Sequence, residues 1–219
     1  MKVKLISYSE PAGEMPADID DVQDLVAYCA RVSNPGNQTN TDTSEKLLRY
    51  LIKNKHWSPF EMVSVCLEIE TTRDIARQIL RHRSFSFQEF SQRYAVADLG
   101  FDFREARLQD TKNRQNSIET ENNALRLNWE TQQDYVIHAA SKAYKWAIEN
   151  GIAKEQARVV LPEGITVSRL YMNGTLRSWL HYIELRSANG TQKEHREVAV
   201  ECAKVISKVF PMVMEFVEK

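Results

Sequence analysis

The chain has 219 residues, which is enough for one folded domain with a sizeable core. Its formal net charge is −1, so it lacks the global positive field that recruits nucleic acids or anionic membranes. No segment approaches the roughly 20 apolar residues of a membrane span, and the N-terminal apolar run is too short for a signal peptide. The three cysteines form no CxxC pair, which favours a reducing compartment, and we therefore expect a cytoplasmic protein.

Hydrophobic periodicity predicts strands and helices in irregular alternation. Strands are expected at residues 3–8, 63–70 and 165–172, and helices at residues 19–32, 44–53, 73–83, 124–149, 154–160, 175–185 and 192–210. Loops are expected at residues 33–43 and 110–123, an extended segment at 56–61 and a turn at 173–174. Because no regular βαβ rhythm is present, we predict an α+β fold. It would be a single domain, residues 1–219, with a β-sheet packed against several helices.

The clearest local pattern is a cluster of arginines near the middle of the chain. Arg73, Arg77 and Arg81 are four residues apart, so on a helix they share one face. Like charges at that spacing repel each other by a few tenths of a kcal/mol unless an anion lies among them. Arg83 would point elsewhere and could serve a second ligand group. Two hydroxyls and a further guanidinium follow, suited to a phosphate monoester: Ser86, Ser91 and Arg93.

An isolated Arg-His-Arg triplet would usually be a solvated helix end whose charges complement the helix dipole. Here the triplet opens a longer pattern, R-H-R-x-x-S-x-x-x-x-S-x-R, at residues 81–93. This pattern resembles the defining motif of the flavin-dependent thymidylate synthases. Three further blocks are similar to segments of that family: HWSPFE at 56–61, ARVVLP at 157–162 and LRSWLHYIELR at 176–186.

The resemblance implies an enzyme, a methyltransferase that makes dTMP from dUMP. In that family 5,10-methylenetetrahydrofolate gives the carbon and reduced FAD gives the hydride, while NADPH reduces the flavin again. It also implies a homotetramer whose active sites are shared between subunits. Independently of it, the near-neutral net charge and the lack of a span predict no nucleic-acid or membrane partner, and no histidine pair has the HxxxH or HxxH spacing of a metal site.

The resemblance also assigns site residues. The dUMP site would comprise Gln78, Ile79, Leu80, Arg81, Glu89, Phe90, Ser91, Gln92, Arg93, Arg158 and Arg186. The FAD site would comprise Ser58, Arg81, His82, Arg83, Glu89, Thr175, Leu176, Arg177 and His181. Ser91, Arg93 and Arg158 would hold the phosphate. Arg186 is the expected catalytic residue, because a fixed cation beside the pyrimidine carbonyls stabilises the ionised, electron-rich ring and removes the need for a covalent nucleophile.

The chain departs from the family pattern at four places, which concern the flavin more than dUMP. Met62 replaces a histidine, and Gly190 stands where some members have a flavin-contacting histidine. Thr175 and His181 stand where the family often has asparagines.

Three alternatives remain open for the sequence. A cysteine-dependent thymidylate synthase needs an activated thiolate, whereas Cys29, Cys66 and Cys202 all lie in runs typical of a core. A nucleic-acid-binding module could stack bases on the phenylalanines of residues 81–93, but we expect these rings to anchor the loop in the core. Taken singly, Arg158 could pair with Glu155, and His181 could be an ordinary half-buried histidine.

Overall fold

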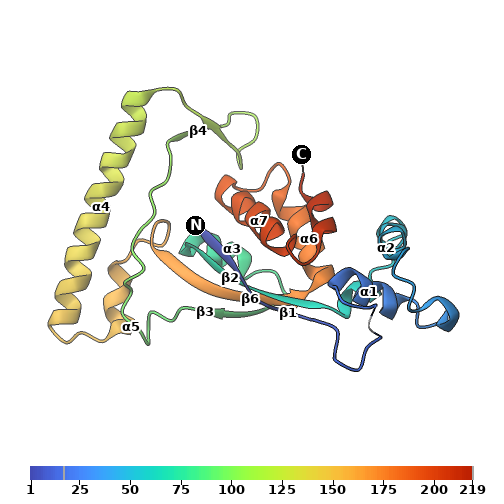
Figure 1. Cartoon of the computed structure of the whole chain (residues 1–219). Coiled ribbons are helices and arrows are strands. Elements are labelled where there is room, and N and C mark those ends of the chain that lie inside the picture. The colour runs from blue at the N-terminus through green and yellow to red at the C-terminus, as the bar shows by residue number, and fades with distance from the viewer. Residues whose placement is uncertain (17, 219) are drawn as a thin grey trace.

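The chain folds around one antiparallel sheet. The computed structural model describes residues 1–16 and 18–218. The sheet has the order β1-β2-β6-β3, and its strands are β1 (Lys2–Tyr8), β2 (Ser64–Thr72), β6 (Val167–Thr175) and β3 (Ser86–Glu89). Helices α6 (Leu176–Ser187) and α7 (Lys193–Ile206) lie together over one face of it (Figure 1). The predicted α+β class is confirmed.

The remaining elements flank this core. The other helices are α1 (Val22–Ala30), α2 (Ser44–Lys53), α3 (Arg73–Ile79), α4 (Asn123–Glu149) and α5 (Lys154–Ala157). Short 3-10 helices are η1 (Pro35–Asn37), η2 (Ser58–Glu61), η3 (Arg158–Val160) and η4 (Pro211–Phe216), and β4 (Arg107–Gln109) pairs with β5 (Ser117–Glu119) in a small hairpin.

Strand β2 shows why the sheet has one apolar face. Val65, Leu67 and Ile69 are fully buried, while the alternate residues are half-buried. Opposite them on β6 stand Gly174, Met172 and Leu170. The predicted alternation is therefore confirmed, and the apolar face packs on α6 and α7 in one hydrophobic core.

Two predicted boundaries are wrong for identifiable reasons. The arginine helix ends at Ile79 rather than near residue 83, because the chain must turn before Ser86 pairs with Asn173 of β6. Residues 81–83 therefore lie in the turn and not on the helix. Residues 58–61 form a 3-10 helix rather than an extended segment, since Pro59 suits the first turn of a helix.

The predicted turn at residues 173–174 is also wrong. Both residues belong to β6, and Gly174 pairs with Val65 of β2. A β-carbon built on Gly174 would lie 2.4 Å from Cδ1 of Phe85. The glycine is therefore needed for the close approach of the Phe85 ring, a role that glycine often has inside a strand.

Helix α4 confirms the predicted long helix and stands apart from the sheet (Figure 1). The Asn122 side chain accepts from Leu125 N at its start, and Gly151 with φ of 75° follows its end. Few of its side chains are buried. Exposed apolar side chains along it are Leu125, Leu127, Trp129, Tyr135, Val136 and Trp146.

Candidate active site

Helix α6 holds the Arg-His-Arg turn in place by hydrogen bonds. Arg186 Nε donates to His82 Nε2 at 2.9 Å, and Ser178 Oγ donates to the carbonyl of Ser84 at 3.2 Å. Arg186 and His82 are 104 residues apart in the sequence. The tertiary fold thus joins the end of the block at residues 176–186 to the Arg-His-Arg triplet at residues 81–83.

The aromatic ring that follows the turn fixes it further. Phe85 packs edge-on against Trp179 with ring centroids 4.9 Å apart, and against Tyr182 at 5.9 Å. Phe85 and Phe87 both pack against the main core. The expectation that the rings anchor the loop in the core is confirmed for Phe85 and Phe87, which removes the reason to read these two rings as a base-stacking surface.

His82 is held in its neutral form. Burial, together with the charges of Arg186 and Arg81, lowers the pKa of His82 to about 4. Its Nε2 therefore offers a lone pair to Arg186, and its proton lies on Nδ1. Arg186 uses only Nε in this contact, so its two terminal nitrogens remain for a ligand.

Glu89 is the anion among the arginines of α3. Its carboxylate lies 3.6 Å from Arg73 Nη1 and 3.2 Å from Arg77 Nη1, and Ser168 Oγ donates to it at 2.9 Å. Arg73 is buried, so the carboxylate offsets a charge that would otherwise be costly. Since Glu89 is engaged in this way, the exposed charges of the turn, Arg81 and Arg83, are available to an anionic ligand.

The predicted flavin residues of α6 gather where this helix meets η2. Arg177 Nη1 lies 2.5 Å from Glu61 Oε1, and the His181 ring packs edge-on against Trp57 at 4.5 Å. Burial and the charge of Arg177 lower the pKa of His181. Thr175 caps α6, and exposed Ser58 begins η2.

The predicted phosphate residues form a separate group around α5. Arg93 Nη2 lies 3.2 Å from Glu155 Oε2, and Arg158 Nε donates to the main-chain carbonyl of Glu155 at 3.3 Å. Ser91 is exposed just after β3. The Arg93–Glu155 ion pair is exposed and contributes about 0–1 kcal/mol, so a phosphate could replace the carboxylate. The Arg158–Glu155 pairing considered above is made to a carbonyl, not to the carboxylate.

Some predicted site residues point into the core. Ile79 and Leu176 are fully buried, and Gln92 is nearly so. Only their main chain can face a ligand. Leu80 and Phe90 are half-buried, and Phe90 N donates to Arg169 O, which extends the pairing of β3 with β6.

A polar chain next to Arg186 was missed by sequence reasoning. Tyr182 Oη and His195 Nε2 are 3.1 Å apart, and His195 Nδ1 lies 3.1 Å from Gln78 Oε1. Gln78 Nε2 donates to Gln192 Oε1 at 2.8 Å, and Gln192 Nε2 donates to Glu194 Oε2 at 2.9 Å. The position of Tyr182, one helical turn before Arg186, could have indicated that it lies near the site. His195 gave no such signal, because it stands outside every motif.

Residues 15–212 match the family model described as "Thymidylate synthase complementing protein". The chain belongs to this family. A protein of Synechocystis sp. named flavin-dependent thymidylate synthase is 48% identical over 218 residues, covering 100% of both chains. A probable flavin-dependent thymidylate synthase of Paramecium bursaria Chlorella virus 1 is 48% identical over 213 residues, covering 97% of each. The crystal structure of the UMP/dUMP methylase PolB from Streptomyces cacaoi, bound with 5-Br dUMP, superposes with a TM-score of 0.81 at 26% identity, covering 98% of this chain and 93% of that one.

In this member of the thymidylate synthase complementing protein family, no cysteine is poised as a nucleophile. Burial raises the pKa of Cys29 and of Cys66, and it raises that of fully buried Cys202 far above its usual value. A reactive cysteine needs the opposite shift. The cysteine-dependent alternative therefore has no residue to carry it.

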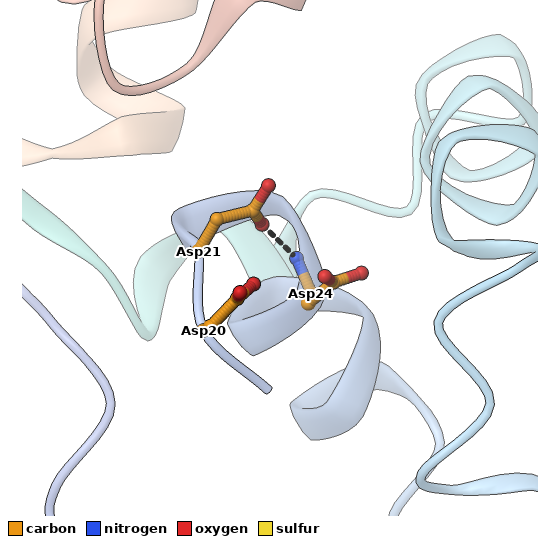
Figure 2. A group of neighbouring side chains, drawn as sticks. All are labelled: Asp20, Asp21 and Asp24. Carbon is orange, nitrogen blue, oxygen red and sulfur yellow. Dashed lines mark hydrogen bonds between the residues drawn. The ribbon is translucent and has the colours of Figure 1, made fainter. Parts of the chain in front are cut away.

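The group of neighbouring carboxylates at the start of α1 is explained by helix capping. The ligand atoms of Asp20, Asp21 and Asp24 lie within 4.8 Å of one another (Figure 2). Asp21 Oδ1 accepts from Asp24 N at 2.8 Å, as an N-cap residue does. Exposed acidic groups of this kind commonly occur without a metal.

Among the described residues, no helix of this chain is both long enough and apolar enough to cross a membrane.

Proposed function

We propose that this chain is a flavin-dependent thymidylate synthase that converts dUMP to dTMP by reductive methylation. The carbon comes from 5,10-methylenetetrahydrofolate, and NADPH provides the reducing equivalents through FAD. The observation that carries the proposal is the contact of Arg186 with His82, because it joins the last helix block to the Arg-His-Arg turn. Family membership over residues 15–212 and the names of the two relatives at 48% identity support it.

The residues around the turn fit FAD chemically. A flavin dinucleotide carries a pyrophosphate, and the exposed guanidiniums of Arg81 and Arg83 suit its oxygens. Arg177 adds a third cation, the hydroxyl of Ser58 adds a donor, and Thr175 is the N-cap of α6. When bound, the reduced flavin supplies the hydride of the reaction. The protein groups bind and orient it at the junction of η2, α6 and the turn.

Arg186 is the residue that we assign to the activation of uracil. Its Nε is committed to neutral His82, which fixes the plane of the guanidinium. The terminal nitrogens can then face the carbonyl oxygens of the pyrimidine, where a fixed cation stabilises negative charge as C5 becomes nucleophilic. Electronic activation of this kind needs no thiolate, in accord with the raised pKa values of the cysteines.

We assign the phosphate of dUMP to the group around α5. Arg93 and Arg158 provide two guanidiniums, and Ser91 provides a hydroxyl. Both arginines contact Glu155, so their side chains lie over the same short helix. A dianionic phosphate monoester is a stronger partner for two guanidiniums than one exposed carboxylate.

The absorption spectrum of the purified protein tests the proposal. We expect a bound-flavin spectrum that bleaches with NADPH and is restored by dUMP together with methylenetetrahydrofolate, with formation of dTMP. UMP in place of dUMP is the matched control, since the structural neighbour from Streptomyces cacaoi is titled a UMP/dUMP methylase. A protein that binds no flavin, or that methylates UMP and not dUMP, would contradict the proposal.

We also propose a homotetramer with shared active sites. The exposed apolar side chains of α4 would be covered by another copy, since patches of this kind mark association surfaces. The grouping of Arg186 near His82 and of Arg93 near Glu155 is what a site divided between two chains requires. Each chain would act as one domain over residues 1–219. The unpaired cysteines suit a reducing compartment, so we assign the enzyme to the cytoplasm, without nucleic-acid or membrane partners.

A further inference from the structure

A buried histidine outside every motif contacts a residue of the proposed dUMP site. His195 on α7 is fully buried, and its Nδ1 lies 3.1 Å from Oε1 of Gln78. Its other nitrogen, Nε2, lies 3.1 Å from the hydroxyl of Tyr182, which is itself buried. The mechanism above gives neither His195 nor Tyr182 a role.

The Gln78 neighbour fixes where the proton of His195 lies, since the Tyr182 hydroxyl can either donate or accept. An amide oxygen can only accept, so Nδ1 must carry the proton and donate it to Gln78 Oε1. Nε2 then has a lone pair and accepts from the Tyr182 hydroxyl. The neutral ring that this requires is favoured by burial and by the charge of Arg186, which lower the pKa of His195 to about 3.

The hydrogen bonds at the Glu194 end of this network require the same orientation of the Gln78 amide. Glu194 is a carboxylate that pairs with Arg107 at 2.6 Å, so it can only accept from Gln192 Nε2. Gln192 therefore turns its oxygen toward Gln78, and that oxygen accepts from Gln78 Nε2. The Glu194 end thus selects one of the two orientations of the Gln78 amide, and a protonated Nδ1 on His195 matches that orientation.

We propose that His195, whose Nδ1 proton is directed at Gln78 Oε1, is a positioning residue that holds Gln78 as a hydrogen-bond donor to the nucleotide. Gln78 Nε2 gives one of its two hydrogens to Gln192. The second hydrogen is left for an acceptor oxygen of the pyrimidine nucleotide. If the amide were flipped, its Oε1 would face that acceptor oxygen without a hydrogen between them. The inference rests on the proposed function, which places Gln78 in the dUMP site.

Two substitutions at the same position separate orientation from packing. In His195→Asn, the side-chain amide can place its nitrogen near the position of Nδ1 and keep a donor to Gln78. In His195→Gln, the amide reaches the position of Nε2, keeps the contact to Tyr182 and loses that donor. We expect dUMP to bind about tenfold more weakly to His195→Gln and within about threefold of wild type to His195→Asn, with FAD affinity unchanged in both. Equal loss of dUMP affinity in both variants would overturn the inference.

A double-mutant cycle with Gln78→Ala gives a readout that a merely structural role would not produce. If His195 acts through Gln78, His195→Gln weakens dUMP binding in the wild-type background and has little effect in the Gln78→Ala background. Additive effects overturn the inference. Weak dUMP binding in Gln78→Ala alone shows that Gln78 contacts the nucleotide. If wild type itself does not bind dUMP, it is the proposed function that fails.

The wild-type protein provides a test that does not depend on a variant folding. Nitrogen-15 NMR of histidine-labelled holoenzyme distinguishes the two neutral tautomers. We expect His195 to carry its proton on Nδ1. A proton on Nε2 in wild type would overturn the inference.

Discussion

At the scale of single residues, the geometry of Arg186 matters as much as its charge. A lysine at this position keeps one positive charge but has neither the planar fork nor the Nε–H that His82 accepts. Arg186 lies at the end of α6 and is half-buried, so we expect a lysine to be accommodated there without unfolding the chain. This separation between folding and catalysis makes the residue testable.

We predict that Arg186→Lys folds and binds FAD nearly as wild type but loses most of its turnover, by about 100-fold or more, as when one transition-state donor is removed. Thermal unfolding and flavin absorbance check the first part, and the rate of dTMP formation checks the second. Turnover close to that of wild type would show that Arg186 does not activate the uracil.

The buried histidines predict how stability depends on pH. The pKa of His195 is lowered to about 3 and that of His82 to about 4 in the folded chain. As the pH falls, these histidines therefore take up protons in the unfolded chain near pH 6.5, before they do so in the folded chain. The free energy of unfolding is therefore highest above pH 6.5 and falls as the pH drops toward 3. For fully buried His195, the slope approaches about 1.4 kcal/mol per pH unit well below pH 6.5.

Urea unfolding between pH 7.5 and pH 5, at one protein concentration, measures this dependence above the range where carboxylates titrate. His195→Asn carries no titrating group at this position, and we expect its slope to be smaller by the contribution of one proton. An identical slope in the variant and wild type would mean that His195 is protonated in the folded state.

At the scale of elements, the junction of β6 with α6 positions both halves of the proposed flavin site. Thr175 ends the strand and caps the helix, and the Leu176 main chain donates to Val63 O. The Phe85 ring crosses β6 at Gly174, so the Arg-His-Arg turn can approach the strand only where no side chain intervenes.

We predict that Gly174→Ala destabilises the protein by about 1–3 kcal/mol, because the new β-carbon overlaps a ring that is held between Trp179 and Tyr182. Gly36→Ala is the matched control, since nothing lies within 4 Å of its β-carbon. We expect the control to unfold within about 0.5 kcal/mol of wild type. Equal effects of the two substitutions would show that Phe85 moves without strain.

At the scale of the whole molecule, the proposed dUMP residues lie in two places. Arg186 contacts the turn after α3, whereas Arg93 and Arg158 lie over α5, and α4 beyond it is largely exposed. In a symmetric assembly, the α5 group of one copy can complete the Arg186 group of another.

Mixing experiments test this division. Arg186→Lys and Arg93→Ala subunits should each be nearly inactive alone. When equal amounts of the two are unfolded together and reassembled, they should recover about a quarter of the wild-type turnover. Random assortment places an intact α5 group beside an intact Arg186 group in about one site in four. Light scattering should give the mass of four chains. If each chain contained a complete site, mixing would restore nothing.

Much of the fold could be predicted because its signals are local. Neighbouring residues alone predict the apolar alternation of β2. They also predict the long helix α4, which Asn122 caps and Gly151 follows. The glycine at position 174 predicts a turn, but the structural reason for it is the close approach of the Phe85 ring. That ring lies far away in the sequence, so no local pattern reveals the contact. Strand β3 was missed because four residues pair only when β6 is beside them.

The residue types of the site can be read from the amino-acid sequence: two arginines around a histidine, spaced hydroxyls, and further arginines in two distant blocks. Their order and spacing carried the family resemblance. Which of these residues meet depends on the tertiary structure. Hydrogen bonds such as Arg186 to His82, and the chain from Tyr182 through His195 to Gln78, join residues on different elements. Their partners depend on how α3, α6 and α7 pack over the sheet, and no local pattern encodes that packing.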